Sequence, residues 1–141
     1  MKKVNELIKL PEVKTIFNLF NDNQGIYLVG GCIRDTLSGK EVTDIDFAID
    51  IDPEEVVKTL SNNNIKFYDI GINYGTVTAV IDSKNYEITS LREDIETDGR
   101  HAKVKYTSDI KADSLRRDFT INAIYANRDG ELFDFHNGID D

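Results

Sequence analysis

Asp44 and Asp46 are the residues of this sequence whose types and spacing best suit chemistry on a phosphate. They flank Ile45 at the start of residues 45–49, which read as a strand, and side chains two apart on a strand project to one face. Two carboxylates on one rigid face suit Mg²⁺, a hard cation that prefers oxygen ligands. A pair of such ions can activate an attacking hydroxyl and stabilise a leaving pyrophosphate. An isolated pair of this kind is explained equally well by two aspartates that only face solvent. The neighbouring residues must therefore decide whether the pair is a metal site.

A second pair with the same spacing, Asp50 and Asp52, provides an internal control. Asp52 precedes Pro53 and stands where an N-cap is expected, with Glu55 placed to close a capping box. Asp50 stands at the exit of the preceding strand. We assign this second pair to structure, which shows that spacing alone does not identify a site.

Gly30 and Gly31 follow a short apolar strand and precede a short predicted helix. Backbone N–H groups at such a turn can approach an anion at the positive end of the helix dipole. Arg34 lies one turn into that helix and can reach the same phosphate, and Asp35 can hold its guanidinium in place. The alternative is a glycine turn followed by a surface ion pair. The whole series of strand, Gly-Gly, Arg-Asp and then Asp44-Ile45-Asp46 is far less expected by accident than any one part.

Glu87 is the candidate for a third carboxylate. It lies in residues 85–91, which read as a strand, with Tyr86 and Ile88 on the opposite face. It faces the aspartates if that strand is a sheet neighbour of residues 45–49. The alternative is a strand residue that faces solvent.

The densest cluster of polar residues lies in residues 115–123, at helical spacing. Arg116 and Arg117 project at different angles, so at most one can sit squarely on a triphosphate. Asp118 could orient an arginine, and Asn122 offers an amide to a sugar or phosphate. An ordinary amphipathic helix with a charged face is the alternative.

The elements that must position these residues predict an α+β domain with one central mixed sheet and helices mainly on one face. Helices are expected over residues 4–20 with a break near Pro11, over 53–61, and in the segment that begins at Leu115. Strands are expected at residues 26–29, 45–49, 66–70, 76–81, 85–91 and 131–135. Residues 92–110 are polar with little periodicity and predict a long mobile loop.

Length and composition fit one globular domain of 141 residues. No apolar run approaches the roughly 20 residues that cross a bilayer, and the single Cys32 has no partner for a disulfide, so a cytoplasmic location is expected. The net charge is −9, from 26 acidic and 17 basic residues, which repels RNA at long range. If RNA is a substrate, the affinity of the protein for it must come from a local basic patch or from protein outside this sequence.

Five ordered blocks resemble the class II tRNA nucleotidyltransferases, or CCA-adding enzymes, and the bacterial poly(A) polymerases. Residues 28–35 and 43–48 resemble the nucleotide-binding and metal motifs of that family. Residues 74–78, 86–92 and 116–123 match its later head motifs in order. The likeness runs from about Ile26 to Asp141. Tyr74 stands where a histidine is common in the family, which leaves the role of that position open.

The resemblance implies a polymerase-β-like head that transfers a nucleotide from CTP or ATP to the 3′ end of tRNA. Asp44, Asp46 and Glu87 would be its catalytic acids and would bind two Mg²⁺ ions, one of them shared with the nucleotide. The nucleotide-binding residues would be Gly30, Gly31, Arg34, Asp35, Arg117, Asp118 and Asn122. The segment after Arg92 matches the family's flexible loop, thought to help the switch from C to A addition.

We expect residues 1–141 to form a single head domain without the helical neck, body and tail of the family, and to have weak or no activity alone. A separate helical segment is then a further expected partner, beside CTP or ATP and the tRNA 3′ end, and no membrane is expected. The alternatives are a poly(A) polymerase head and a nucleotidyltransferase that modifies a protein or a small molecule. A non-enzymatic nucleotide-binding module is a further alternative, but it needs fewer carboxylates than this sequence carries. The product, whether CCA, CC, A or poly(A), does not follow from these residues.

Overall fold

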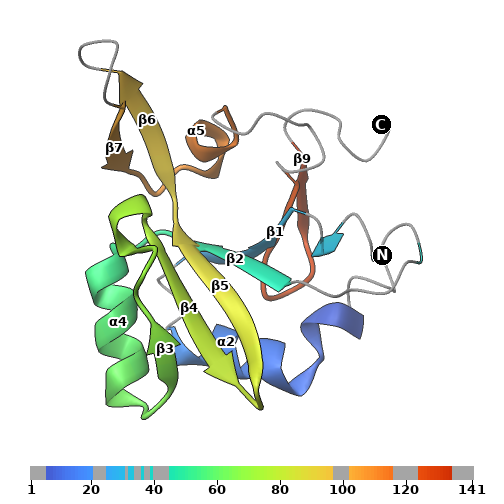
Figure 1. Ribbon diagram of the computed structural model, residues 1–141. Coiled ribbons are helices and arrows are strands. Elements are labelled where there is room, and N and C mark those ends of the chain that lie inside the picture. The colour runs from blue at the N-terminus through green and yellow to red at the C-terminus, as the bar shows by residue number, and fades with distance from the viewer. Residues whose placement is uncertain are drawn as a thin grey trace.

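The computed structural model describes residues 6–20, 25–30, 32, 33, 36, 39, 45–96, 102–115 and 124–134. Within them a seven-stranded mixed sheet forms the centre of the molecule (Figure 1). In spatial order its strands are β3 (Lys66–Tyr68), β4 (Thr76–Ile81), β5 (Lys84–Ser90), β2 (Ile45–Ile49), β1 (Ile26–Val29), β8 (Ile124–Ala126) and β9 (Leu132–Asp134). The β2–β5 pair is parallel and the other neighbouring pairs are antiparallel. The predicted mixed sheet is confirmed.

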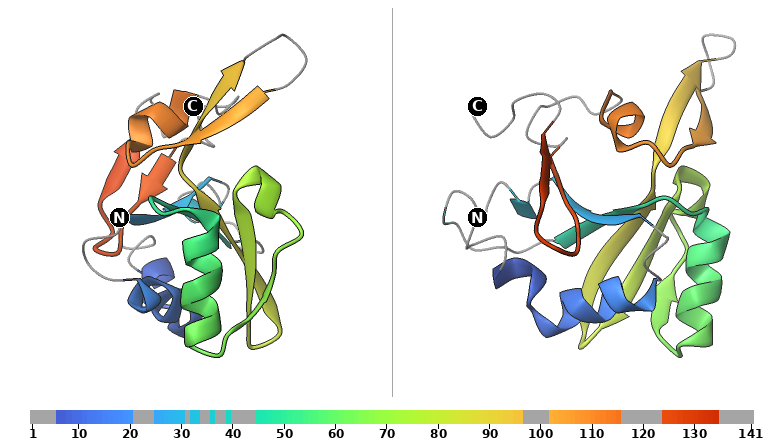
Figure 2. Two further views of the ribbon diagram at one scale, coloured as in Figure 1. Left: turned by 90° about the vertical axis from the view of Figure 1, so that its left-hand side faces the viewer. Right: turned by 180° about the vertical axis from the view of Figure 1, so that it is seen from behind.

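Two helices cover one face of this sheet (Figure 2). They are α2 (Pro11–Leu19) and α4 (Pro53–Asn62), and a helical turn at residues 6–8 precedes α2. Phe17 of α2 packs edge-to-face on Phe47 of β2, with ring centroids 5.4 Å apart. Burying such a side chain contributes about 1.5–3 kcal/mol. The main core lies on this face of the sheet. The predicted break at Pro11 and the helices on this face are confirmed.

Helix α4 begins where the sequence predicts, but not by the predicted contact. Asp52 occupies the N-cap position and Pro53 the first turn, yet the Asp52 side chain makes no capping hydrogen bond. Backbone N–H groups of Glu55 and Val56 donate to the Asp52 carbonyl instead. The expected capping box is therefore wrong, and the fixed φ of Pro53 is what favours the helix start.

A smaller apolar cluster lies on the opposite face of the sheet, where the short helix α5 (Ile110–Leu115) packs. Its fully buried members are Val29, Ala48, Leu91 and Tyr125, with Tyr27, Ile110 and Phe133 packed against them. Since alternate strand residues face opposite sides, this is also the face of Asp46 and Glu87. We call it the site face.

Residues 92–96 and 102–106 are strands and not the predicted mobile loop, while residues 97–101 lie outside the described part of the chain. The two strands form a second sheet, β6 (Arg92–Glu96) paired with β7 (Ala102–Tyr106), which projects from the main sheet in Figures 1 and 2. Alternation of apolar and polar residues identifies a strand where one face is buried. Strand β7 does alternate, with Ala102, Val104 and Tyr106 separated by lysines, but β6 is polar apart from Ile95, so the pattern marks only one strand of the hairpin.

Strand β8 was also not expected, because it has three residues and no alternation to mark it. The strand predicted at residues 131–135 is its partner β9. Within the described part of the chain, no helix is long and apolar enough to span a membrane.

Candidate active site

Asp46 and Glu87 lie side by side on neighbouring strands. The register of the parallel strands β2 and β5 pairs Asp46 with Glu87. The next pair, Phe47 and Ile88, is fully buried in the main core, so both carboxylates project from the site face. Paired strands lie about 4.8 Å apart, so a single cation can reach oxygens of both residues. Glu87 therefore lies on the face that the sequence predicts, and its catalytic role stays a prediction.

The polar row continues onto β4. Thr78 pairs with Glu87 on the side away from Asp46. Two pairs further along, on the same face, the hydroxyl oxygens of Thr76 and Thr89 are 3.0 Å apart and hydrogen-bonded. The site face of β2, β5 and β4 thus carries carboxylate and hydroxyl oxygens in adjacent rows.

Gly30 lies at the end of β1, directly after Val29, which pairs with Asp46. Its φ is +80°, in the left-handed region that favours glycine, and the space that a Cβ would take is open. Its own N–H donates to the carbonyl of Ile124 at 3.2 Å. Gly30 therefore offers space for an approaching phosphate, while its N–H is already used in the sheet.

Cys32 lies beneath Asp46 and is buried. Its thiol donates to the carbonyl of Val29 at 3.5 Å. Burial, with a smaller contribution from the nearby Asp46 carboxylate, raises the pKa of the Cys32 thiol to about 11, against backbone hydrogen bonds that lower it. A protonated, neutral thiol at pH 7 is neither a nucleophile nor a cation ligand.

Seven further predicted site residues lie outside the described residues, and their roles stay predictions. They are Gly31, Arg34, Asp35, Asp44, Arg117, Asp118 and Asn122. Among the residues that the structure does describe, no group of three or more His, Cys, Asp or Glu is placed to hold a metal. The two neighbouring carboxylates nonetheless fit a hard cation by their chemistry, and Asp44 is the third member that the sequence supplies.

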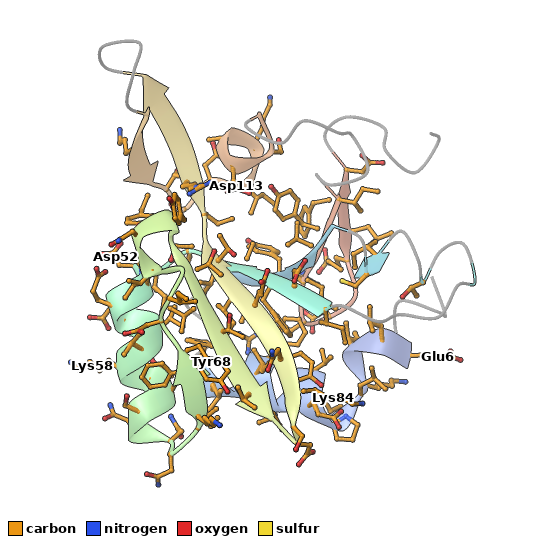
Figure 3. The ribbon with its side chains drawn as sticks, viewed as in Figure 1. Glu6, Asp52, Lys58, Tyr68, Lys84 and Asp113 are labelled. Carbon is orange, nitrogen blue, oxygen red and sulfur yellow. The ribbon has the colours of Figure 1, made fainter. Side chains whose placement is uncertain are left out.

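Asp113 is a residue of this region that the sequence reasoning missed. It lies on α5 next to the start of β6 (Figure 3) and is fully buried. Its carboxylate accepts hydrogen bonds from the backbone N–H of Arg92 at 3.0 Å and from the hydroxyl of Tyr125 at 2.5 Å. It therefore ties α5 and the hairpin to the sheet. The only signal in the sequence is a carboxylate one turn before Arg116, which by itself is equally typical of a solvated helix face.

Tyr74, the departure from the family pattern, makes its contact through the backbone. Its carbonyl accepts a hydrogen bond from Arg92 Nη1 at 2.7 Å, while its side chain is 70% exposed. Any residue at position 74 offers that carbonyl. Gly75 is more restricted, because its φ is +81° and a Cβ there would lie 3.2 Å from the ring of Tyr106.

A family model, the poly A polymerase head domain, matches residues 26–141. The chain belongs to this family. It is 41% identical over 125 residues to the mitochondrial CCA tRNA nucleotidyltransferase 1 of Danio rerio, and the match covers 87% of this chain and 29% of that protein. The chain thus spans about 30% of the length of the curated relatives it matches.

Two solved structures support the same relationship. The Bacillus stearothermophilus CCA-adding enzyme in complex with CTP is 30% identical, with a TM-score of 0.77 over 93% of this chain and 31% of that one. A tRNA nucleotidyltransferase complexed with a primer tRNA and an incoming ATP analogue is 29% identical, with a TM-score of 0.66 over 84% and 33% of the two chains. The predicted nucleotidyltransferase head fold is confirmed.

Proposed function

We propose that this chain is the catalytic head of an enzyme that transfers nucleotides from CTP or ATP to the 3′ end of tRNA. The observation that carries the proposal is the pairing of Asp46 with Glu87 on adjacent strands, in a chain of the poly A polymerase head family. The similar proteins named above are CCA-adding enzymes, and one of them is a complex with CTP.

In the proposed reaction, the 3′ hydroxyl of the acceptor attacks the α-phosphorus of the nucleoside triphosphate. A new phosphorus–oxygen bond forms, the bond between the α-phosphorus and the bridging oxygen breaks, and pyrophosphate leaves. Asp44, Asp46 and Glu87 would hold two Mg²⁺ ions. When bound, these ions lower the pKa of the attacking hydroxyl and offset charge on the leaving group.

The remaining predicted site residues bind and orient the nucleotide. The open space at Gly30 lets a phosphate approach the start of the following helix. Arg34 and Arg117 supply guanidinium groups that suit a triphosphate, with Asp35 and Asp118 as their orienting carboxylates. Asn122 is assigned to the sugar or a phosphate by the same reasoning.

The test combines binding with turnover. Calorimetry with CTP, with and without Mg²⁺, measures nucleotide binding by the chain itself. Labelled CTP and ATP, with tRNA that lacks its CCA end, measure incorporation, and the product length separates C, CC, CCA and longer A tails. Mg²⁺-dependent CTP binding with incorporation supports the proposal. Absence of both removes it.

The acceptor is the least constrained part of the proposal, because the chain spans about 30% of its relatives' length. The same labelled ATP, offered to an unstructured RNA, tests whether the head belongs to a poly(A) polymerase, as the family name suggests. Label transferred to a protein would favour a protein-modifying nucleotidyltransferase. CTP binding without any transfer of label, also when a helical tRNA-binding segment is supplied, would favour a non-enzymatic nucleotide-binding module. The cytoplasmic location stays a prediction, and the Danio rerio relative is a mitochondrial protein by name.

A further inference from the structure

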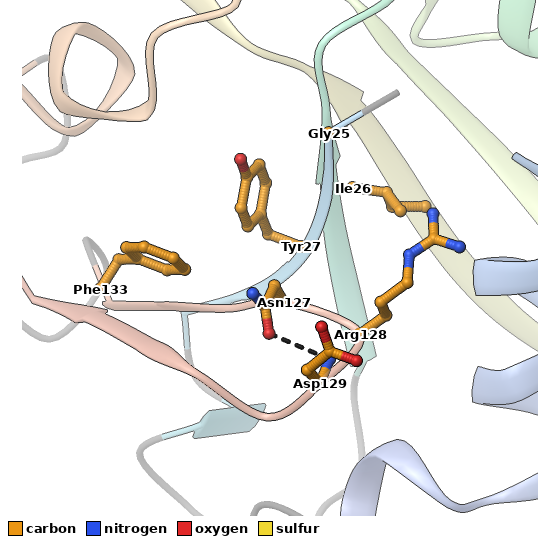
Figure 4. A pocket seen from close by; sticks show the side chains of 7 residues that line it. All are labelled: Gly25, Ile26, Tyr27, Asn127, Arg128, Asp129 and Phe133. Atoms are coloured by element: carbon orange, nitrogen blue, oxygen red, sulfur yellow. Dashed lines mark hydrogen bonds between the residues drawn. The ribbon is translucent and has the colours of Figure 1, made fainter. Parts of the chain in front are cut away.

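Two hollows meet at the turn between β8 and β9. The first, about 550 Å³, lies towards α2 and is lined by Ile8, Lys9, Lys14, Phe17, Arg128 and Asp129, among others. The second, about 420 Å³, is lined by Tyr27, Asn127 and Phe133, together with the same Arg128 and Asp129 (Figure 4). The two hollows share Arg128 and Asp129, so they adjoin at this turn, the first on the α2 side of the sheet and the second on the site face. We call the two hollows together the turn strip.

The first hollow is positively charged in a strongly acidic protein. Lys9 and Lys14 are exposed, Arg128 adds a third cation, and Asp129 is the one acidic residue among the described residues of the lining. The chain as a whole carries −9. The buried side chains of Ile8 and Phe17 form an apolar floor beneath these charges. A local basic patch of this kind is what an acidic protein needs to hold a polyanion.

The turn that carries Arg128 is held by a network of short contacts. The side-chain oxygen of Asn127 accepts from the N–H groups of Asp129 and Glu131, each at 3.0 Å. Arg128 Nη2 donates to the carbonyl of Phe20 at 3.3 Å, which fixes its guanidinium beside α2. The cation between the two hollows is therefore positioned before any ligand arrives.

The second hollow offers aromatic surface. Tyr27 and Phe133 are half-buried, with ring centroids 5.9 Å apart in an edge-to-face contact. Tyr27 makes a similar contact with Tyr125 at 6.1 Å, so the rings are locked in orientation. Figure 4 shows these rings and the Asn127 amide around one space. Fixed aromatic rings beside a cationic groove are typical of sites that bind a single nucleic-acid strand.

Arg128 and the second hollow lie within reach of the candidate active site, whereas Lys9 and Lys14 lie on the other side of the sheet, towards α2. The sheet register aligns Asp46 with Val29 and Val29 with Tyr125, and Arg128 is three residues beyond Tyr125. Two strand spacings and three residues of rise correspond to about 14 Å. Tyr27 projects from the site face, two residues before Val29. A strand of a few nucleotides could span both places.

We propose that the turn strip binds a single-stranded segment of the RNA acceptor, an inference that rests on the proposed function. Lys9, Lys14 and Arg128 contact phosphates, and Tyr27 and Phe133 receive a base. The strip supplies part of the affinity for RNA, which the net negative charge of the whole chain opposes.

The first test is a double substitution, Lys9→Gln with Lys14→Gln, read by fluorescence anisotropy of a labelled oligoribonucleotide with the sequence of a tRNA 3′ strand. Loss of two phosphate contacts should make the negative slope of log affinity against log salt shallower by about 1.4, or 0.7 per contact for single strands. The matched control is Lys58→Gln with Lys66→Gln, since both lysines are exposed and lie on α4 and β3, at the other edge of the sheet from β8 and β9. If the two double variants change the salt dependence equally, the effect comes from the net charge of the protein and not from the strip, and the proposal is overturned.

Two further variants change the strip in different directions. Asp129→Asn removes its opposing charge and should tighten RNA binding by a few-fold. Phe133→Leu should weaken binding with the salt slope unchanged, because it removes stacking and no phosphate contact. Thermal melting checks that each variant is folded. If Asp129→Asn leaves RNA binding unchanged or weakens it, the assignment of the strip as a surface that binds phosphates is contradicted.

Labelled CTP distinguishes an RNA strand from a free nucleotide. We expect the Lys9, Lys14 double to bind CTP as the unaltered chain does. A CTP affinity that falls with the RNA affinity would overturn the proposal in favour of a mononucleotide site. If the unaltered chain incorporates CTP but the double binds RNA normally, the strip is wrong and the proposed function stands. If RNA binding depends on the two lysines but no CTP is incorporated, the strip stands and the proposed function is wrong.

Discussion

The two ends of β2 carry aspartates that project to the same face, yet their surroundings differ. Asp46 at one end has Glu87 beside it on β5 and the open turn at Gly30 beyond β1. Asp50, just past the other end, has no paired carboxylate among the described residues. Its backbone N–H donates to the carbonyl of Gly25, and its carboxylate raises the pKa of Tyr27, after the larger effect of burial. The difference teaches that neighbouring strands, and not the Asp-x-Asp spacing, make one end a candidate site.

The sharpest way to break this comparison is to remove one charge from each Asp-x-Asp pair. Asp46→Asn should lower nucleotide incorporation by about 10³-fold or more, because several kcal/mol of transition-state stabilisation depends on the ligand. Asp52→Asn, from the second pair, should leave incorporation within about threefold, since its side chain makes no capping bond and α4 keeps its start. Steady-state incorporation of labelled CTP measures both. Near-normal turnover in the Asp46 variant would remove the assignment of the site.

The neighbour on β5 offers the next test. Glu87→Gln should lower incorporation by about 10- to 100-fold and raise the Mg²⁺ concentration needed for half-maximal rate, as loss of a supporting ligand does elsewhere. Glu54→Gln, an exposed glutamate on α4, is the control. A Mg²⁺ titration at saturating CTP gives the answer. An unchanged Mg²⁺ requirement would mean that Glu87 is only a solvent-facing strand residue.

Asp113 extends the comparison to a buried carboxylate whose neighbours are hydrogen-bond donors. Asp113→Ala should reduce the free energy of unfolding by about 2–4 kcal/mol, because it leaves the Tyr125 hydroxyl and the Arg92 N–H without this acceptor. Tyr125→Phe should have a smaller effect, about 1 kcal/mol. Urea denaturation of the singles and the double measures the coupling between them. Additive losses would show that the contact between these two side chains contributes nothing.

Cys32 provides the smallest expected effect and a pH dependence. Its pKa is raised to about 11 in the folded chain. A thiol whose folded pKa lies above its unfolded pKa of about 8.5–9 binds more protons when folded, so stability falls as pH rises through that range. The loss should reach about 1 kcal/mol at pH 9.5. Urea denaturation at pH 7.5, 8.5 and 9.5 should show this slope in the unaltered chain and a shallower one in Cys32→Ala. Parallel curves for the two proteins would contradict the buried thiol.

Much of the fold and part of the candidate site could be predicted from local patterns. Buried strands such as residues 45–49 show in their apolar residues, and Pro53 marks a helix start because its φ is already helical. The chain must turn sharply after strand β1, and Gly30 stands there because glycine readily adopts the left-handed φ of such a turn. The alternation of Tyr86, Glu87 and Ile88 determined which face of β5 carries the carboxylate. These features depend on residues close together in the chain, so the sequence by itself determines them.

Contacts between distant segments decided the rest. The placement of Asp46 beside Glu87 depends on the parallel pairing of β2 with β5, which no local pattern specifies. The β6 strand carries no alternation to pair with that of β7, and only the tertiary structure shows the β6–β7 hairpin projecting from the main sheet. Asp113 is indistinguishable in sequence from a solvated aspartate until the fold brings Arg92 and Tyr125 to it. Burial and hydrogen bonding across long sequence separations are properties of the packed molecule, and they make a structural or catalytic group out of an ordinary residue type.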